Sequence, residues 1–244
     1  MKSIYAFILI PIIIIQPLFP QKTAPAYLTV TGSATFRNTY KRGNLDDWWS
    51  EQLGMSGEAV DDGSPAFFTL EAGMSLPLTS DAFRMGATFG FIMPAKHSIW
   101  GSRQVYGYNL VLKPHIISIG MPFMFQLADI EGLYAKINPA LLMGWVTGYY
   151  WSPYNEVDFV LSPGIGFGLA GSVEYFFTDM LGVDFTMGFR AVKGGLSIDD
   201  PESPTGVSIF NLSNGDEVHV DLGGVYMTFG VVARLPAFKM QLPQ

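Results

Sequence analysis

The stretch 165–190, with the sequence IGFGLAGSVEYFFTDMLGVDFTMGFR, decides the fold of this chain. On both sides of the break Thr178-Asp179-Met180, large apolar residues recur at every second position, with small or polar residues between them. Because successive side chains of a β-strand point to opposite faces, this period of two predicts strands with two unlike faces. The short break predicts a tight antiparallel connection between them.

The same alternation recurs along the rest of the chain and makes eight segments in all. The segments span 27–38, 67–76, 83–94, 115–127, 133–147, 163–177, 181–193 and 219–235. Each is long enough for a tilted strand to cross a bilayer. In the last segment the phase of the alternation slips at Gly223-Gly224, which predicts a β-bulge at this point.

The composition of the two faces distinguishes a membrane protein from a soluble one. One face carries large aliphatic and aromatic residues, and the other carries mostly Gly, Ser, Thr and Ala with few charges. A soluble barrel or sandwich would turn its apolar face inward and carry charged residues outside. Small side chains instead suit the lumen of a narrow barrel whose bulky face meets lipid. The sequence therefore predicts an all-β fold, an eight-stranded antiparallel transmembrane up-and-down β-barrel.

The overall composition agrees with this class. The chain has 244 residues, which fits one domain, and 14% of them are charged, against about 25% in ordinary soluble domains. The formal net charge of −7 argues against a nucleic-acid partner. The absence of cysteine excludes disulfides, thiolate nucleophiles and cysteine metal sites. We expect no cofactor and no metal centre.

The N-terminus has the pattern of a secretory signal. Lys2 precedes the apolar run 4–19, and Pro11 and Pro17 within that run argue against a stable membrane-spanning helix. A retained membrane anchor is the alternative. The expected organisation is a signal peptide over 1–21 with cleavage between 20 and 26, a barrel over 27–238, and a short periplasmic tail over 239–244.

The connections between segments alternate in length. Those at 77–82, 128–132 and 178–180 are short, and those at 39–66, 95–114, 148–162 and 194–218 are long. Short periplasmic turns and long outer loops are typical of outer-membrane barrels, and an even number of strands places both termini in the periplasm. The first and last long loops are acidic, through Asp46, Asp47, Glu51, Glu58, Asp61, Asp62, Asp199, Asp200, Glu202, Asp216 and Glu217.

The acidic loops admit two interpretations. Clustered carboxylates can hold a divalent cation, but the spacing matches no twelve-residue calcium loop, which favours ordinary solvated loops. Aromatic residues gather near the loop bases and predict an outer interfacial girdle. These aromatic residues are Trp100, Trp145, Tyr149, Tyr150, Trp151 and Tyr154.

The face with small residues carries the charges that we predict to form a lumen network. They are Arg37, Glu71, Arg84, Lys136, Glu174, Asp184, Arg190 and Arg234. Charges in a narrow, poorly solvated lumen have to pair. We expect Lys136 to lie by Glu174 and Asp184 to lie by Arg234, as part of a salt-bridged plug. A gated channel in which these pairs exchange partners is the alternative.

The histidines give little support to an enzyme. They are His97, His115 and His219, and the close His/Ser pairs are His97 with Ser98 and His115 with Ser118. A hydrolase needs a nucleophile and a base within reach of each other. Three ordinary histidines explain the pattern without catalysis, so we predict that the protein is not an enzyme.

The chain resembles the small eight-stranded outer-membrane barrels, the OmpA-like, OmpX-like and OmpW-like group. The resemblance covers roughly residues 27–238 and rests on the signal, the eight segments and the strand–turn–strand stretch 168–185. Members usually end in an aromatic residue read by the assembly machinery, whereas here Phe238 is followed by six further residues. The resemblance is architectural and does not select one function.

We therefore expect a monomer in the cell outer membrane with a structural or surface-interaction role through its acidic extracellular loops. A narrow pore for small solutes is the first alternative, and a lipid-modifying enzyme is the second. The expected partners are outer-membrane lipid and lipopolysaccharide, the outer-membrane assembly machinery and an extracellular ligand. Basic residues near the outer rim would meet lipopolysaccharide phosphates. They are Lys41, Arg42, Lys96, Arg103, Lys113 and Lys193.

Overall fold

The computed structural model describes most of the chain between Lys22 and Leu242. The described residues are 22–38, 47, 51, 60–61, 67–80, 82–94, 97–103, 106–127, 130–152, 155–160, 163–195, 197–199, 207–209, 214–216 and 218–242. Among them, no helix has the length and apolar character needed to cross a bilayer.

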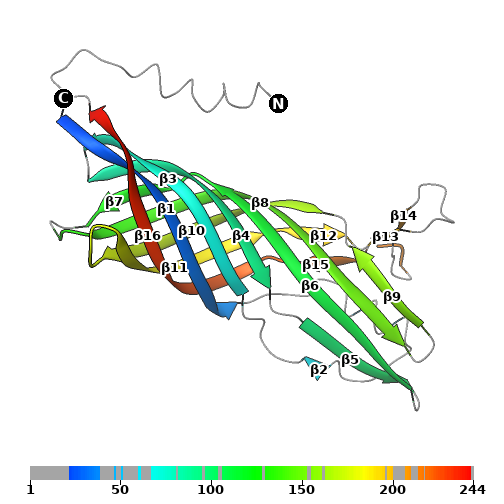
Figure 1. Cartoon of the computed structure of the whole chain (residues 1–244). Coiled ribbons are helices and arrows are strands. Elements are labelled where there is room, and N and C mark those ends of the chain that lie inside the picture. The colour runs from blue at the N-terminus through cyan, green and yellow to red at the C-terminus, as the bar shows by residue number, and fades with distance from the viewer. Residues whose placement is uncertain are drawn as a thin grey trace.

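Long antiparallel strands form a closed barrel (Figure 1). The wall consists of β1 (Lys22–Asn38), β3 (Phe67–Ser80), β4 (Phe83–Pro94), β6 (Tyr106–Gly120) with β7 (Phe123–Gln126), β8 (Leu133–Ser152), β10 (Gly164–Phe176), β11 (Leu181–Ala191) and β16 (Gly224–Leu242). β1 pairs with β3 on one side and with β16 on the other, which closes the wall. β6 and β7 together form one wall strand, interrupted at Met121 and Pro122. The predicted eight-stranded antiparallel barrel is confirmed.

The barrel has apolar side chains on its outer face and polar side chains on its inner face, the reverse of a soluble protein. Large apolar residues on the outer face are exposed, with 85% of Ile165 and 67% of Leu141 accessible. Small polar residues on the inner face, such as Ser172 and Thr228, are buried. In water such a surface would be strongly destabilising, whereas a bilayer solvates it and requires every backbone group to be hydrogen-bonded within the wall.

Several segments that we predicted as outer loops contain strands. β5 (His97–Arg103) pairs with β6, and β9 (Asn155–Val160) pairs with β8. With β2 (Val60–Asp61) on β5, these strands continue the wall past the barrel as a projecting sheet, visible in Figure 1. Two short ribbons lie nearby, β12 (Lys193–Gly195) with β15 (His219–Asp221) and β13 (Ser197–Asp199) with β14 (Val207–Ile209). Continued backbone pairing explains why β6 and β8 extend beyond their predicted segments.

The terminal strands also run further than predicted. β16 continues to Leu242, where it pairs with Lys22, so the stretch expected as a tail is largely in the wall. At the other end of β16, the strand conformation is interrupted between Asp221, the last residue of β15, and Gly224, the first residue of β16. A β-bulge was predicted at this point. Gly224 has φ of 133° there, a conformation that residues with a Cβ rarely adopt. The start of β1 and the end of β16 lie at the same end of the barrel as the short turns, called the turn end below. The opposite end, with the projecting sheet, is called the loop end.

Candidate functional site

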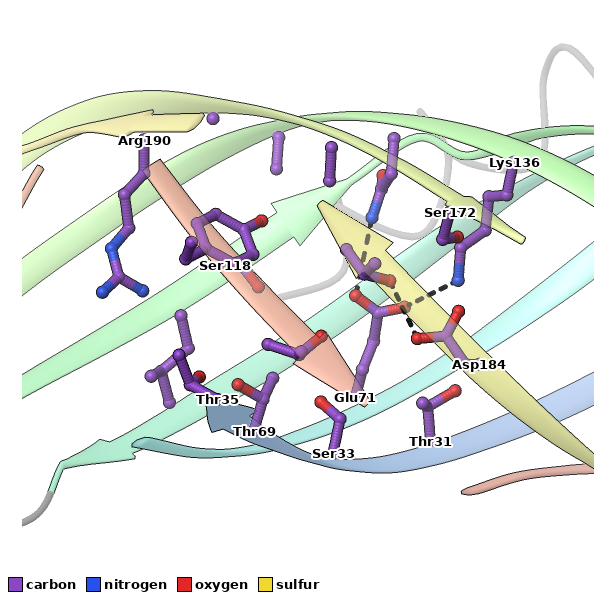
Figure 2. A pocket seen from close by; sticks show the side chains of 18 of the residues that line it. Thr31, Ser33, Thr35, Thr69, Glu71, Ser118, Lys136, Ser172, Asp184 and Arg190 are labelled. Carbon is purple, nitrogen blue, oxygen red and sulfur yellow. Dashed lines mark hydrogen bonds and ion pairs between the residues drawn. The ribbon is translucent and has the colours of Figure 1, made fainter. Parts of the chain in front are cut away.

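The candidate site is the lumen, whose lining comes from alternate residues of the wall strands. It encloses a cavity of about 80 Å³ between hydroxyl groups and a small set of charges. Figure 2 shows Glu71, Lys136, Ser172 and Asp184 at one side of this cavity and Arg190 at the other. The hydroxyl side chains that line it include Thr31, Ser33, Thr35, Thr69, Ser118, Thr186 and Thr228.

Lys136 on β8 is the centre of the charged group. Its Nζ lies 2.6 Å from Oε1 of Glu174 on β10, and both side chains are buried, with 10% and 3% exposed. The same Nζ lies 3.8 Å from Oε1 of Glu71, which comes from β3 on the other side of the lumen. One ammonium group therefore links three wall strands, and the expected proximity of Lys136 to Glu174 is found.

A third carboxylate, Asp184 on β11, completes this group. It lies directly across the β10–β11 pairing from Glu174, and its Oδ1 accepts a 2.8 Å hydrogen bond from Thr186. Asn138 joins the network from β8, where its Nδ2 donates a long hydrogen bond of 3.5 Å to Glu71. We name Glu71, Lys136, Glu174 and Asp184 the lumen cluster. It has three acids and one base.

Arg84 lies at the turn end and is almost completely buried. Its Nη2 donates to the carbonyl oxygens of Pro25 at 2.6 Å and of Ser75 at 3.3 Å. Its guanidinium also lies 4.6 Å from the centre of the Tyr27 ring. Through these contacts Arg84, on β4, connects the start of β1 to β3 and stabilises the wall at the turn end.

Arg234 lies at the turn end too, but it is not brought to Asp184. Its Nε donates a 2.8 Å hydrogen bond to the carbonyl oxygen of Asp179, and its guanidinium lies 3.9 Å from the centre of the Phe176 ring. Asp184 instead lies opposite Gly230 in the β11–β16 register. The expected Asp184–Arg234 pairing is replaced by a cation–π contact.

Aromatic and aliphatic side chains fill the lumen at the turn end. Met124, Tyr134, Phe176 and Val232 form a buried apolar cluster there. The rings of Tyr134 and Phe176 meet edge to face, with centroids 6.1 Å apart. We had not predicted that these residues lie in the lumen. The alternation of the strands could have placed them there. Tyr134 and Phe176 are each two positions from an inward-facing residue, Lys136 and Glu174, and therefore lie on the same face of their strands.

A second apolar group fills the loop end. Leu222, from the segment before β16, is buried, and its amide donates a 2.9 Å hydrogen bond to the carbonyl of Val192. A Cβ placed on Gly144 would lie 2.8 Å from Cδ1 of Leu222, so Leu222 reaches across the inner face of β8. Arg190 supports this inward fold, because its Nε donates a 3.0 Å hydrogen bond to the carbonyl of Leu222. Both ends of the described lumen are thus packed.

Other residues singled out from the sequence lie outside the lumen or outside the residues that the structure describes. The side chain of Arg37 and most of the acidic loop residues are not among the described ones. In the expected girdle, Trp145 stacks on His115 with centroids 5.3 Å apart, and Trp151 is exposed.

The pair His115 and Ser118 does not form a catalytic site in the described structure. His115 stacks between outward aromatic rings, with its Nε2 3.2 Å from Oγ1 of Thr147. Ser118, three positions later on the same strand, lines the lumen cavity. An odd spacing along a strand places two side chains on opposite faces of the wall. Among the described residues, no group of three or more histidine and carboxylate side chains is arranged to hold a metal ion.

A closed antiparallel barrel with an apolar outer face and a polar, packed lumen defines a class. The chain is an outer-membrane β-barrel protein with the architecture of the small eight-stranded barrels.

No protein-family model and no curated protein matches the sequence. Similar solved structures include the outer membrane protein OprG from Pseudomonas aeruginosa, with 10% identity, a TM-score of 0.46, and coverage of 90% of this chain and 100% of that chain. Neisserial surface protein A has 11% identity, a TM-score of 0.44 and coverage of 88% and 99%. Ail, the attachment invasion locus protein of Yersinia pestis, has 12% identity, a TM-score of 0.43 and coverage of 86% and 99%.

Proposed function

We propose that this protein acts at the cell surface, where its projecting sheet and acidic outer loops contact an extracellular ligand, while its lumen does not conduct. The observation that carries the proposal is the packing of both lumen ends, by the Met124–Tyr134–Phe176–Val232 cluster and by Leu222. A sealed lumen leaves the outer surface as the part of the molecule available for interaction. The strands β5, β6, β8 and β9 supply that surface beyond the barrel.

Two experiments test the two halves of this proposal. In planar bilayers, the purified protein is expected to give no discrete current steps, because water and ions have no continuous path. Regular current steps would support the narrow pore instead, in which Lys136 exchanges between Glu174 and Glu71.

The surface role is tested by expressing the protein in a non-adherent bacterium and measuring attachment to host cells and matrix-coated surfaces. We expect attachment to increase and to be lost when residues 99–110, the tip between the paired Ser98 and Val111, are replaced by a two-residue turn. Neutralising the last loop by Asp199→Asn, Asp200→Asn and Glu202→Gln tests the contribution of charge. Unchanged attachment with the intact protein on every surface would count against the surface role.

We further propose that the barrel has no lipid-modifying activity. The opposite orientations of His115 and Ser118 support this. Mass spectrometry of lipid A from cells with and without the protein tests it, and a mass difference equal to one acyl chain would contradict it.

A further inference from the structure

The regular pairing of the wall ends early where β10, β11 and β16 meet at the loop end. β10 pairs with β11 only as far as Phe167 and Ala191, although it runs on to Gly164 along β8. β11 pairs with β16 as far as Arg190 and Gly224. Both strands then lead into the β12–β15 ribbon at the loop end (Figure 1). The last residues of β10 therefore have a paired neighbour on the β8 side and none in the pairing with β11.

The segments that follow these pairs fold toward the lumen. A Cβ on Gly144, on the inner face of β8, would lie 3.2 Å from Cγ1 of Val192 and 2.8 Å from Cδ1 of Leu222. A Cβ on Gly166 would overlap the carbonyl oxygen of Ala191, so the backbone passes close to the inner side of β10. The inward fold that fills the loop end of the lumen thus leaves a hollow on the outer face of the wall.

The hollow is apolar and large enough for part of a ligand. Its volume is about 570 Å³, and ligand pockets span about 300–1,000 Å³. Ile165, which has no partner in the pairing with β11, is 85% exposed. The large side chains that line the hollow come from three strands and are Ile165, Phe167, Phe189 and Val225. Between β11 and β16 the lining is small, with Ala191, Gly223 and Gly224.

An ammonium group lies at the loop end of this apolar lining. Lys193 is exposed and follows Ala191 on the outer face of the same segment. Asp221 lies opposite Lys193 in the β12–β15 pairing, and its Oδ1 accepts a 2.8 Å hydrogen bond from the amide of Gly223. The guanidinium of Arg190 is directed into the lumen (Figure 2), where its Nε bonds to the carbonyl of Leu222. Lys193 is thus the basic group that the rim offers to a phosphate.

We propose that this hollow binds one acyl chain of lipid A, the membrane anchor of lipopolysaccharide, with a lipid A phosphate at Lys193. The hollow belongs to the outer face of the wall, so its occupant comes from the bilayer. The long loops mark the outer side of the membrane, whose outer leaflet contains lipopolysaccharide. Burial of methylene groups supplies affinity, and the phosphate contact selects the lipid. The site is independent of any ligand of the outer loops.

Native mass spectrometry of the detergent-solubilised protein tests the site with added diphosphoryl lipid A or phosphatidylglycerol. We expect one lipid A to be retained at concentrations where phosphatidylglycerol is lost. Ala191→Trp fills the hollow and should weaken lipid A binding about tenfold, which corresponds to losing contact with about two methylene groups. Ala87→Trp, at an exposed position of β4, is the matched control and should bind normally. Equal retention of both lipids, or normal binding by Ala191→Trp, would overturn the proposal.

A second set of variants tests the phosphate contact without changing the hollow. Lys193→Gln should weaken binding of diphosphoryl lipid A about two- to fivefold, as expected for an exposed ion pair, and leave binding of dephosphorylated lipid A unchanged. Lys239→Gln, at the turn end, is the control and should alter neither. Asp221→Asn keeps an oxygen for the Gly223 amide, removes the neighbouring negative charge and should strengthen binding. Equal losses for both forms of lipid A in Lys193→Gln, or weaker binding in Asp221→Asn, would contradict the assignment.

Discussion

Lys136→Met is the substitution that tests the lumen cluster most sharply. It keeps most of the side-chain volume and removes the ammonium group, so Glu71, Glu174 and Asp184 face one another without it. For the 2.6 Å pair of Lys136 and Glu174, Coulomb's law with an effective dielectric constant of about 20 gives roughly 6 kcal/mol of attraction before desolvation is subtracted. Breaking a buried pair by removing one partner costs about 3–5 kcal/mol. We expect Lys136→Met to lower the free energy of unfolding by about 3–5 kcal/mol.

The assay is urea unfolding of the protein in lipid vesicles, followed by the fluorescence of its five tryptophans. Lys239→Met, at an exposed position of β16, is the matched control and should change stability by less than about 0.5 kcal/mol. The double variant Lys136→Met with Glu174→Gln should recover part of the loss, because it removes a charge that has become unpaired. A loss below about 1 kcal/mol in Lys136→Met would refute the claim that this cluster is buried and coupled.

Three further substitutions test other parts of the barrel by the same unfolding measurement. Leu141→Arg places a charge on the lipid face and should cost about 2–4 kcal/mol if Leu141 lies near the bilayer midplane; a neutral effect would mean that this face does not contact lipid. Gly144→Val should cost about 1–3 kcal/mol, since its side chain would overlap Leu222 and Val192, and an unchanged stability would argue against the inward fold of Leu222. Phe176→Ala should cost about 3–5 kcal/mol by emptying the turn-end cluster, and a loss under 1 kcal/mol would show that this end is not packed.

The fold was predictable because strands that cross a bilayer must satisfy all their backbone hydrogen bonds, and a closed barrel is the arrangement of strands that does so. Ile165 and Leu141 are exposed where the alternation placed them, and Ser172 is buried. The contact of Lys136 on β8 with Glu174 on β10 could be expected because consecutive wall strands pair and both residues have the inward phase near the same end of the barrel.

The partners of Asp184 and Arg234 could not be predicted, because they depend on the register between strands and the order of strands in the sequence does not determine the register. β11 and β16 are joined by a long connection, so nothing local sets which residues meet. The actual register places Asp184 opposite Gly230, with Arg234 further toward the turn end among Phe176 and Tyr134. The inward fold of Leu222 likewise depends on packing against Gly144. The projecting sheet was missed because its strands lie in segments predicted as loops.

We expect the apolar face of the wall to meet lipid while the other face encloses a sealed lumen. Because the chain has no cysteine, single cysteines along β8 can carry spin labels in vesicles, and the label's collision rate with oxygen reports contact with lipid. We expect high rates at Ile137, Leu141 and Met143 and low rates at Asn138 and Leu142, whose labels should also be shielded from water-soluble nickel chelates. High oxygen rates at Asn138 and Leu142, or nickel contact at Leu141, would show that the two faces of the wall are not arranged in this way.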